Sequence, residues 1–231
     1  MKNARQILSQ VKSEKGRLAR IGLTAAAALL SVAFILWASE LVEDELSPFD
    51  NLVYGGVKKL ISEDLTDVMR LISNLGSVYS LVAILAIFWA VSVGKRNLRF
   101  YALGMTINLA IAALMNLLFK TVFHRARPNI LVLANAGGYS FPSGHSMIGA
   151  AFYGYLISVC ILFLKKPWKQ VCSVFLAALI LLIGVSRIYL GVHYASDVVG
   201  GFLAGFAWLA VFLTFFRFAE KRRKRESPEG G

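Results

Sequence analysis

Three short polar clusters interrupt a chain that is otherwise strongly apolar, at 120–128, 142–145 and 186–197. Cationic and titratable side chains within apolar segments cost free energy unless they converge on an anion. A phosphate group suits them best, because arginine can grip two oxygens with its planar fork while lysine acts as a point charge. The candidate residues of these clusters are Lys120, Arg127, Ser143, Gly144, His145, Arg187, His193 and Asp197.

A cationic cradle for phosphate is the first function that these residue types predict. Lys120, Arg127 and Arg187 would stabilise the charge that spreads over the equatorial oxygens during phosphoryl transfer. Ser143 and Gly144 stand where an apolar helix should begin, so their backbone N–H groups and the positive end of that helix should point at the same anion. The Ser143 hydroxyl would be a further donor. Each feature alone also has an ordinary structural explanation, since terminal arginines reach to membrane interfaces and serines cap helices.

The two histidines must have different roles. His193 and Asp197 are four residues apart, which places both side chains on one face of a helix. The carboxylate can accept a hydrogen bond from one ring nitrogen and leave the other free to attack phosphorus. Such His–Asp pairs are more often structural than catalytic, and spacing alone does not decide whether His193 or His145 is the nucleophile. The Asp197 partner favours His193.

The order and internal spacing of these residues resemble the three-part signature of the type 2 phosphatidic acid phosphatase (PAP2) superfamily. The matching patterns are Lys-x6-Arg-Pro, Pro-Ser-Gly-His and Ser-Arg-x5-His-x3-Asp, which together span about a third of the chain. The resemblance implies that His193 forms a phosphohistidine, that Asp197 orients it, and that His145 protonates the leaving oxygen and later activates water. It also implies that the cationic cradle replaces a metal ion. We therefore expect metal-independent turnover and no cofactor, and the sequence shows no spacing typical of a metal site.

The composition indicates an integral membrane protein. Of 231 residues, 57% are hydrophobic, against about 45–50% in soluble proteins, and the mean hydropathy is +0.64. The net charge of +12 does not indicate nucleic-acid binding, because the basic residues flank apolar runs and form no stripe with stacking aromatic residues. Cys160 and Cys172 lie in or beside expected spans and predict no disulfide framework.

We predict an all-α polytopic protein with six transmembrane helices. Residues 21–217 should form one membrane domain between two basic tails, at 1–20 and 218–231, with a short surface helix in the first tail and disorder in the second. The acidic segment 40–74 has apolar residues at helical spacing and should lie on the membrane as an amphipathic helix between the first two spans. Each expected span is about long enough to cross a hydrocarbon core of roughly 30 Å. The expected spans are Ile21–Ser39, Leu75–Val93, Arg99–Phe119, Ser143–Leu164, Gln170–Arg187 and His193–Phe216.

The distribution of basic residues predicts the orientation in the membrane. Eighteen of the 25 Lys and Arg residues lie in 1–20, 94–99, 165–169 and 217–225, and seven lie on the other side. Because basic residues favour the cytoplasmic side, both termini should be cytoplasmic. With six spans, all three polar clusters then fall at the extracytoplasmic end of the bundle.

We therefore expect a lipid phosphatase of the plasma membrane that removes a terminal phosphate at the outer face. The six-span architecture resembles bacterial enzymes acting on undecaprenyl diphosphate, phosphatidylglycerophosphate and phosphatidic acid, and we prefer the prenyl diphosphate because it is released on that face. Two alternatives remain: a phosphotransferase that passes the phosphoryl group to an acceptor hydroxyl, and a catalytically silent protein that binds lipid phosphates.

The sequence leaves several features open. His124 and Arg125 are not fixed by the signature, and each could touch the ligand or serve a structural role at the interface. The acidic segment 40–74 could be a lid, a brace on the membrane surface or a partner site. The glycines of the last span predict close helix packing, but not whether it occurs within one chain or between two, so the oligomeric state is open. These glycines are Gly200, Gly201 and Gly205.

Overall fold

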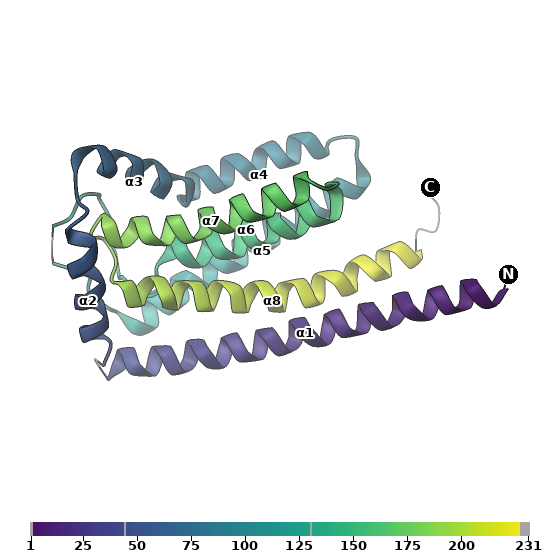
Figure 1. Ribbon diagram of the computed structural model, residues 1–231, viewed down its shortest axis with the longest axis horizontal. Coiled ribbons are helices and arrows are strands. Elements are labelled where there is room, and N and C mark those ends of the chain that lie inside the picture. Colours follow the sequence, from purple (N-terminus) through teal and green to yellow (C-terminus); the bar gives the residue numbers. More distant parts are fainter. Residues whose placement is uncertain (1, 44, 130, 227–231) are drawn as a thin grey trace.

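A computed structural model describes residues 2–43, 45–129 and 131–226 (Figure 1). Within these residues the chain forms eight α-helices and no strand. The helices are α1 (Lys2–Val42), α2 (Ser47–Lys58), α3 (Glu63–Leu75), α4 (Val78–Ser92), α5 (Arg96–Phe123), α6 (Gly144–Phe163), α7 (Trp168–Tyr189) and α8 (Ala195–Glu226).

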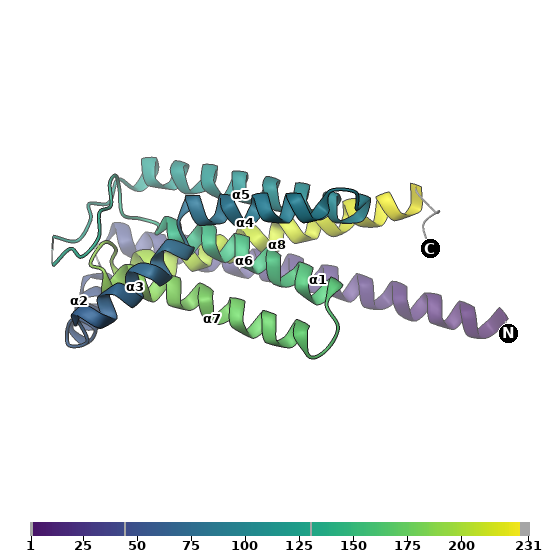
Figure 2. The same ribbon diagram turned by 90° about the horizontal axis from the view of Figure 1, so that it is seen from above.

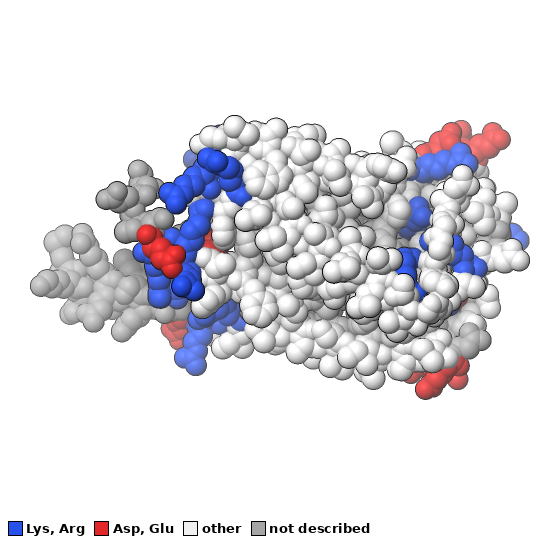
Figure 3. All heavy atoms as spheres, turned by 180° about the vertical axis from the view of Figure 1, so that it is seen from behind, with Lys and Arg blue, Asp and Glu red and all other residues white. Residues whose placement is uncertain are grey.

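The long helices lie side by side along one axis, and α2 crosses one end of the bundle (Figures 1 and 2). Parts of α1, α5, α6, α7 and α8 are long and apolar enough to span a membrane, and α3 with α4 makes a sixth span if that bent pair counts as one. Lys, Arg, Asp and Glu gather at the two ends, with a wide uncharged band between them (Figure 3). An uncharged band around a helical bundle is what a bilayer requires. The prediction of an all-α, polytopic membrane fold is confirmed.

The second span differs from the expectation of one straight helix from Leu75 to Val93. Helix α3 ends at Leu75, α4 begins at Val78, and the pair is bent by 51°. At about 1.5 Å per residue, the 15 residues of α4 alone span roughly 22 Å, short of a hydrocarbon core of roughly 30 Å. Gly76 occupies the break, where a Cβ would lie 2.6 Å from Ile183 Cγ2 and 3.1 Å from His145 Cδ2. A glycine is needed there because α6 and α7 approach the break closely.

Three other segments also differ from the expectation. Helix α1 is continuous, so residues 2–20 extend the first span rather than form a separate surface helix. The single amphipathic helix expected in 40–74 is two helices, α2 and α3. Helix α8 runs on to Glu226, through most of the tail that was expected to be disordered; residues 227–231 lie outside the described part.

Helix α6 is the centre of the bundle and packs against α5, α7 and α8. Its contact with α8 is close because glycines of α8 face its backbone. A Cβ on Gly201 would lie 2.8 Å from the Ser143 carbonyl oxygen, and one on Gly205 would collide with the Met147 carbonyl oxygen. This packing within one chain fixes the start of α6 against α8, and these two helix starts carry His145 and Asp197.

We expect Gly205→Ala to lower the melting temperature of the detergent-solubilised protein. Its Cβ would meet the α6 backbone and lie 3.0 Å from Ala150 Cβ, and overpacking of this kind costs about 1–3 kcal/mol. Gly149→Ala is the matched control, because a Cβ on Gly149 of α6 meets nothing within 4 Å and alanine gains up to about 1 kcal/mol in helix propensity. Equal melting temperatures for the two variants would contradict the close α6–α8 contact.

Candidate active site

The three polar clusters meet at one end of the bundle, where α5 and α7 end and α6 and α8 begin. The segment between α5 and α6 is tied by backbone hydrogen bonds to the segment between α7 and α8, from Leu133 N–H to the Leu190 carbonyl (2.9 Å), and to the first turn of α8, from Ser143 N–H to the Asp197 carbonyl (3.0 Å). Gly191 has φ 68°, and a Cβ there would collide with the Leu131 carbonyl oxygen. Glycine is therefore required at this crossing of the two segments.

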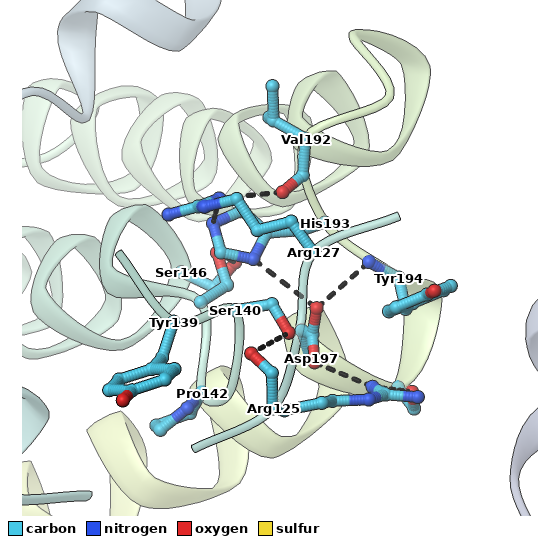
Figure 4. A network of polar contacts seen from close by, with 12 residues as sticks. Arg125, Arg127, Tyr139, Ser140, Pro142, Ser146, Val192, His193, Tyr194 and Asp197 are labelled. Atoms are coloured by element: carbon cyan, nitrogen blue, oxygen red, sulfur yellow. Dashed lines mark hydrogen bonds and ion pairs between the residues drawn. The ribbon is translucent and has the colours of Figure 1, made fainter. Parts of the chain in front are cut away.

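His193 and Asp197 form the centre of the site (Figure 4). His193 Nδ1 lies 3.3 Å from Asp197 Oδ2, and both side chains are buried. The pair does not share a helical face as expected, because α8 begins at Ala195 and His193 lies in the turn before it. The contact forms because Asp197 folds back over that turn and accepts a hydrogen bond from the Tyr194 N–H at 2.9 Å.

The two ring nitrogens of His193 have partners of opposite kind. Nδ1 faces a carboxylate, which only accepts, whereas Nε2 lies 3.2 Å from Arg127 Nη1, which only donates. These partners assign the neutral tautomer with the proton on Nδ1 and a lone pair on Nε2. That lone pair is oriented toward the cationic cluster, the arrangement that a nucleophile attacking a bound anion needs.

Arg127 is held in place by the loops around it. Its Nε donates to the Gly138 carbonyl (3.0 Å), Nη1 to the Val192 carbonyl (2.6 Å) and Nη2 to the Gly137 carbonyl (2.8 Å). A guanidinium has five N–H donors, so these bonds and the contact with His193 do not exhaust it. The guanidinium is therefore fixed beside His193 before any ligand binds.

Lys120 and Arg187 complete the cationic cluster from α5 and α7. Lys120 Nζ donates to the Tyr139 carbonyl. Arg187 is 6% exposed, and its Nη1 donates to Ser73 Oγ at 2.5 Å. Within the described residues, Arg187 Nε is buried and has no hydrogen-bond partner. A buried donor without an acceptor costs free energy, and an anion at this position would satisfy it.

His145, in the first turn of α6, faces the same cluster. The groups that act on it electrostatically are the cations Arg187, Arg127 and Lys120 and the His193 ring. Since these groups come from α5, α7 and the two connecting segments, the electrostatics agree with the hydrogen bonds: the sequence-predicted residues surround one place.

Ser143 and Gly144 lie at the expected position, the start of α6, but the Ser143 backbone does not serve as expected. Its N–H donates to the Asp197 carbonyl instead of pointing at an open anion site, and its hydroxyl accepts from Ser146 Oγ at 3.1 Å. Gly144, the first helical residue, packs against Asn116, whose Oδ1 would lie 3.0 Å from a Cβ. The positive end of α6 is therefore contributed by the N–H groups that follow Ser143.

The two residues left open by the sequence have distinct places. His124 caps α5 with φ 47° and packs its ring against Tyr139, with 4.5 Å between ring centroids. Arg125 binds Asp197 and, from α2, the buried Asp50. Asp50, Ser196 and Ser73 are not predicted from the sequence, because each lies far along the chain from its partner. The one available signal was Asp50, an acidic residue beside the apolar face of an amphipathic segment.

Burial lowers the pKa of two groups outside the spans, His193 and Arg127. Burial lowers the pKa of His193 to about 4, although the hydrogen bond to Asp197 opposes the shift. His193 is thus neutral at pH 7, as a nucleophile must be. Burial also lowers the pKa of Arg127, with the Asp197 carboxylate acting in the opposite direction. No group of three His, Cys, Asp or Glu side chains that could hold a metal ion occurs among the described residues.

Comparison with known proteins places this site within one family. The model of the PAP2 superfamily matches residues 100–221, which include all three polar clusters. The chain is 30% identical over 198 residues to phosphatidylglycerophosphatase B of Bacillus subtilis, covering 84% of this chain and 95% of the relative. It is 27% identical over 152 residues to an undecaprenyl-diphosphatase of Sulfolobus acidocaldarius, covering 63% of this chain and 68% of the relative.

Solved structures show the same architecture. The crystal structure of a transmembrane PAP2-type phosphatidylglycerolphosphate phosphatase from Bacillus subtilis matches with a TM-score of 0.77 at 28% identity, covering 84% of this chain and 96% of that one. Aquifex aeolicus LpxE shares the fold, with a TM-score of 0.58 at 23% identity over 70% of this chain and 92% of that one.

We expect ¹⁵N NMR of histidine-labelled protein to give His193 a pKa near 4, well below the ordinary value of about 6.5. The chain has three histidines, so His124→Asn and His145→Gln assign the signals by removing one each. Asp197→Asn should lower the pKa of His193 further, because it removes the hydrogen bond and charge that raise it. A His193 pKa near 6.5, or a rise in Asp197→Asn, would contradict the buried, carboxylate-bound geometry.

Proposed function

This chain belongs to the PAP2 superfamily and is a membrane phosphatase of the PAP2 type, and from this premise we propose that it hydrolyses the terminal phosphate of a lipid phosphate or diphosphate at the extracytoplasmic face, through a phosphohistidine. The observation that carries the proposal is the environment of His193, with Nδ1 on the Asp197 carboxylate and Nε2 facing Arg127. The ring is neutral, has one fixed tautomer, and directs its lone pair at a cationic cluster.

In the first step the phosphate binds to Lys120, Arg127 and Arg187, and the N-terminal turn of α6 contributes the Ser143 hydroxyl and the backbone N–H groups from Gly144 onward. The cations and the helix end stabilise the charge on the equatorial oxygens. His193 Nε2 then attacks phosphorus, a P–N bond forms, and the P–O bond to the lipid breaks. His145 gives its proton to the leaving oxygen, while Asp197 stabilises the positive charge that develops on the His193 ring.

In the second step water releases the phosphate. His145, now neutral, accepts a proton from water, whose oxygen attacks phosphorus from the side opposite the P–N bond. That bond breaks, His193 regains its lone pair, and inorganic phosphate leaves. The three cations stabilise the negative charge of the phosphoryl oxygens in both steps, so we propose that turnover does not depend on a metal ion.

The substrate class follows from the setting of the site. The cluster lies at the end of a bundle whose uncharged band matches a bilayer, so a lipid can keep its tails in the hydrocarbon while its phosphate reaches His193. The two curated relatives are named for different substrates, phosphatidylglycerophosphate and undecaprenyl diphosphate. We propose that the substrate of this chain belongs to the same class of lipid phosphates.

The membrane side of the site rests on the charge asymmetry of the chain. Residues 21–217 would form the phosphatase domain in the plasma membrane, with the basic segments 1–20 and 218–231 in the cytoplasm. The start of α1 and the end of α8 lie at the end of the bundle opposite to α2 and the polar clusters (Figure 1). A cytoplasmic position for both termini, favoured by the excess of basic residues at that end, puts the site outside.

We expect purified protein in detergent to release inorganic phosphate from phosphatidylglycerophosphate, undecaprenyl diphosphate or phosphatidic acid with EDTA present. His193→Ala should reduce release at least about 1,000-fold, because it removes the nucleophile. His124→Asn, which keeps a residue type that tolerates the left-handed conformation of this helix cap, should retain activity. Release that requires an added acceptor alcohol would indicate a phosphotransferase, and release that persists in His193→Ala would refute the phosphohistidine.

We expect single cysteines to report the sidedness of the membrane domain. In a Cys160→Ser, Cys172→Ser background, Leu131→Cys, at an exposed position near the site, should react with a membrane-impermeant maleimide in intact cells. Lys166→Cys, between α6 and α7 at the opposite end, should react only after the membrane is permeabilised. The reverse pattern would place the site in the cytoplasm and leave the chemistry of the site unaffected.

A further inference from the structure

A second buried carboxylate, that of Asp50, lies next to the His193–Asp197 pair and binds Ser196. Asp50, in the first turn of α2, is 4% exposed. Its Oδ1 accepts from the Ser196 N–H at 2.7 Å, and its Oδ2 accepts from Ser196 Oγ at 2.6 Å and from Arg125 Nη2 at 2.9 Å. Burying a carboxylate is costly unless it is paired and hydrogen-bonded in this way. Helix α2 is thus fixed to the start of α8 at the residue next to Asp197.

Arg125 joins the two carboxylates. Its Nη1 donates to Asp197 Oδ1 at 2.6 Å and to Ser196 Oγ at 2.7 Å, while Nη2 is bound to Asp50. The guanidinium carbon lies 4.2 Å from the centroid of the Tyr194 ring, and the side chain is 17% exposed. Burial by itself lowers the pKa of Arg125, but the Asp197 and Asp50 carboxylates hold it above its usual value. The Arg125 guanidinium is therefore paired with carboxylates, whereas the Arg127 guanidinium is bound by carbonyl oxygens.

The two oxygens of Asp197 have separate partners as a result. Oδ1 belongs to Arg125, whereas Oδ2 faces His193 Nδ1 and the Tyr194 N–H. A carboxylate bound on both oxygens cannot rotate about its Cβ–Cγ bond. Figure 4 shows this arrangement, with Arg125 on one side of Asp197 and His193 on the other.

We propose that Asp50 and Arg125 are positioning residues for the phosphoryl-transfer reaction, which fix the Asp197 carboxylate and set how strongly it acts on His193. We call the two residues the Asp50–Arg125 brace. The inference rests on the proposed function. It assigns Arg125 to Asp197 rather than to the phosphate, and it gives α2, in the acidic segment between the first two spans, a role in the active site.

Charge balance explains why both members are needed. Arg125 alone would neutralise much of the Asp197 charge and weaken its attraction for the proton on His193. Asp50 draws part of the guanidinium charge to itself, so Asp197 keeps a larger share of its negative charge for His193. Loss of Asp50 and loss of Arg125 therefore act on His193 in opposite directions.

The first test separates rate from binding. Asp50→Asn and Arg125→Gln should each lower kcat about 10- to 100-fold, the range typical of groups that orient a reacting residue. KM should stay within about twofold, because neither residue belongs to the cationic cradle. Arg187→Gln, which removes a cradle cation, should instead raise KM. The matched controls Glu226→Gln and Arg222→Gln remove an exposed ion pair at the far end of α8 and should leave both constants unchanged.

The second test uses the pKa of His193, measured by ¹⁵N NMR without turnover. Besides Asp197, the charged or titratable groups that face His193 are Arg127, Arg187 and His145, and all remain in these variants. Asp50→Asn should lower this pKa, Arg125→Gln should raise it, and the double variant, which removes one charge of each sign, should lie between them. General loosening of the site would admit water and move His193 toward its ordinary value in both single variants, so a rise in Asp50→Asn would overturn the proposal.

An alternative variant and the wild-type activity keep the proposal testable in every case. If Asp50→Asn does not fold, Ser196→Ala removes the hydroxyl shared by Arg125 and Asp50 without changing charge, and it should lower kcat with KM unchanged. A wild-type protein that hydrolyses no lipid phosphate refutes the proposed function, while the NMR titration still tests the brace. A wild-type protein that hydrolyses lipid phosphates, with Asp50→Asn and Arg125→Gln equal to it in kcat, refutes the brace alone.

Discussion

The site depends on the buried carboxylate of Asp197. This one residue receives Arg125 from the segment after α5, His193 and the Tyr194 N–H from the turn before α8, and, through its backbone carbonyl, the N–H of Ser143 at the start of α6. An anion without access to water must be fully hydrogen-bonded, so its partners cannot shift independently. Asp197 therefore links all three polar clusters, two of them through its carboxylate and the third through its backbone carbonyl.

The cationic cluster beside Asp197 is rigid for a different reason. Arg127 is held by carbonyl oxygens of two loops, and Arg187 by Ser73 of α3. These contacts orient the guanidinium groups without neutralising them, because carbonyl and hydroxyl oxygens carry only partial charge. Preorganised cations of this kind need no reorganisation when charge develops on a phosphoryl group. The site thus separates two tasks: carboxylates orient His193, the proposed nucleophile, and uncharged oxygens orient the cations that are proposed to bind the phosphate.

The helical packing serves the same end. Gly201 and Gly205 let α8 approach the backbone of α6, and Gly76 lets the break between α3 and α4 approach His145 and α7. The bend of 51° at that break directs α3 against α7, where Ser73 meets Arg187. The membrane-spanning part and the polar end are therefore one packed unit rather than a scaffold with loops attached.

The sequence by itself determined the membrane fold and the grouping of the candidate residues. Apolar runs fix where spans lie, and spans that alternate in direction bring Lys120, His145 and His193 to one end, whatever the details of packing. Only the tertiary structure decided the break at Gly76, the use of the Ser143 N–H by Asp197, and the contact of Asp50 with Arg125. These features depend on which distant side chains share a buried space, and Asp50 and Ser196 are 146 residues apart. Local hydropathy and spacing carry no information about such a pairing, because its free energy arises only when both partners leave water together.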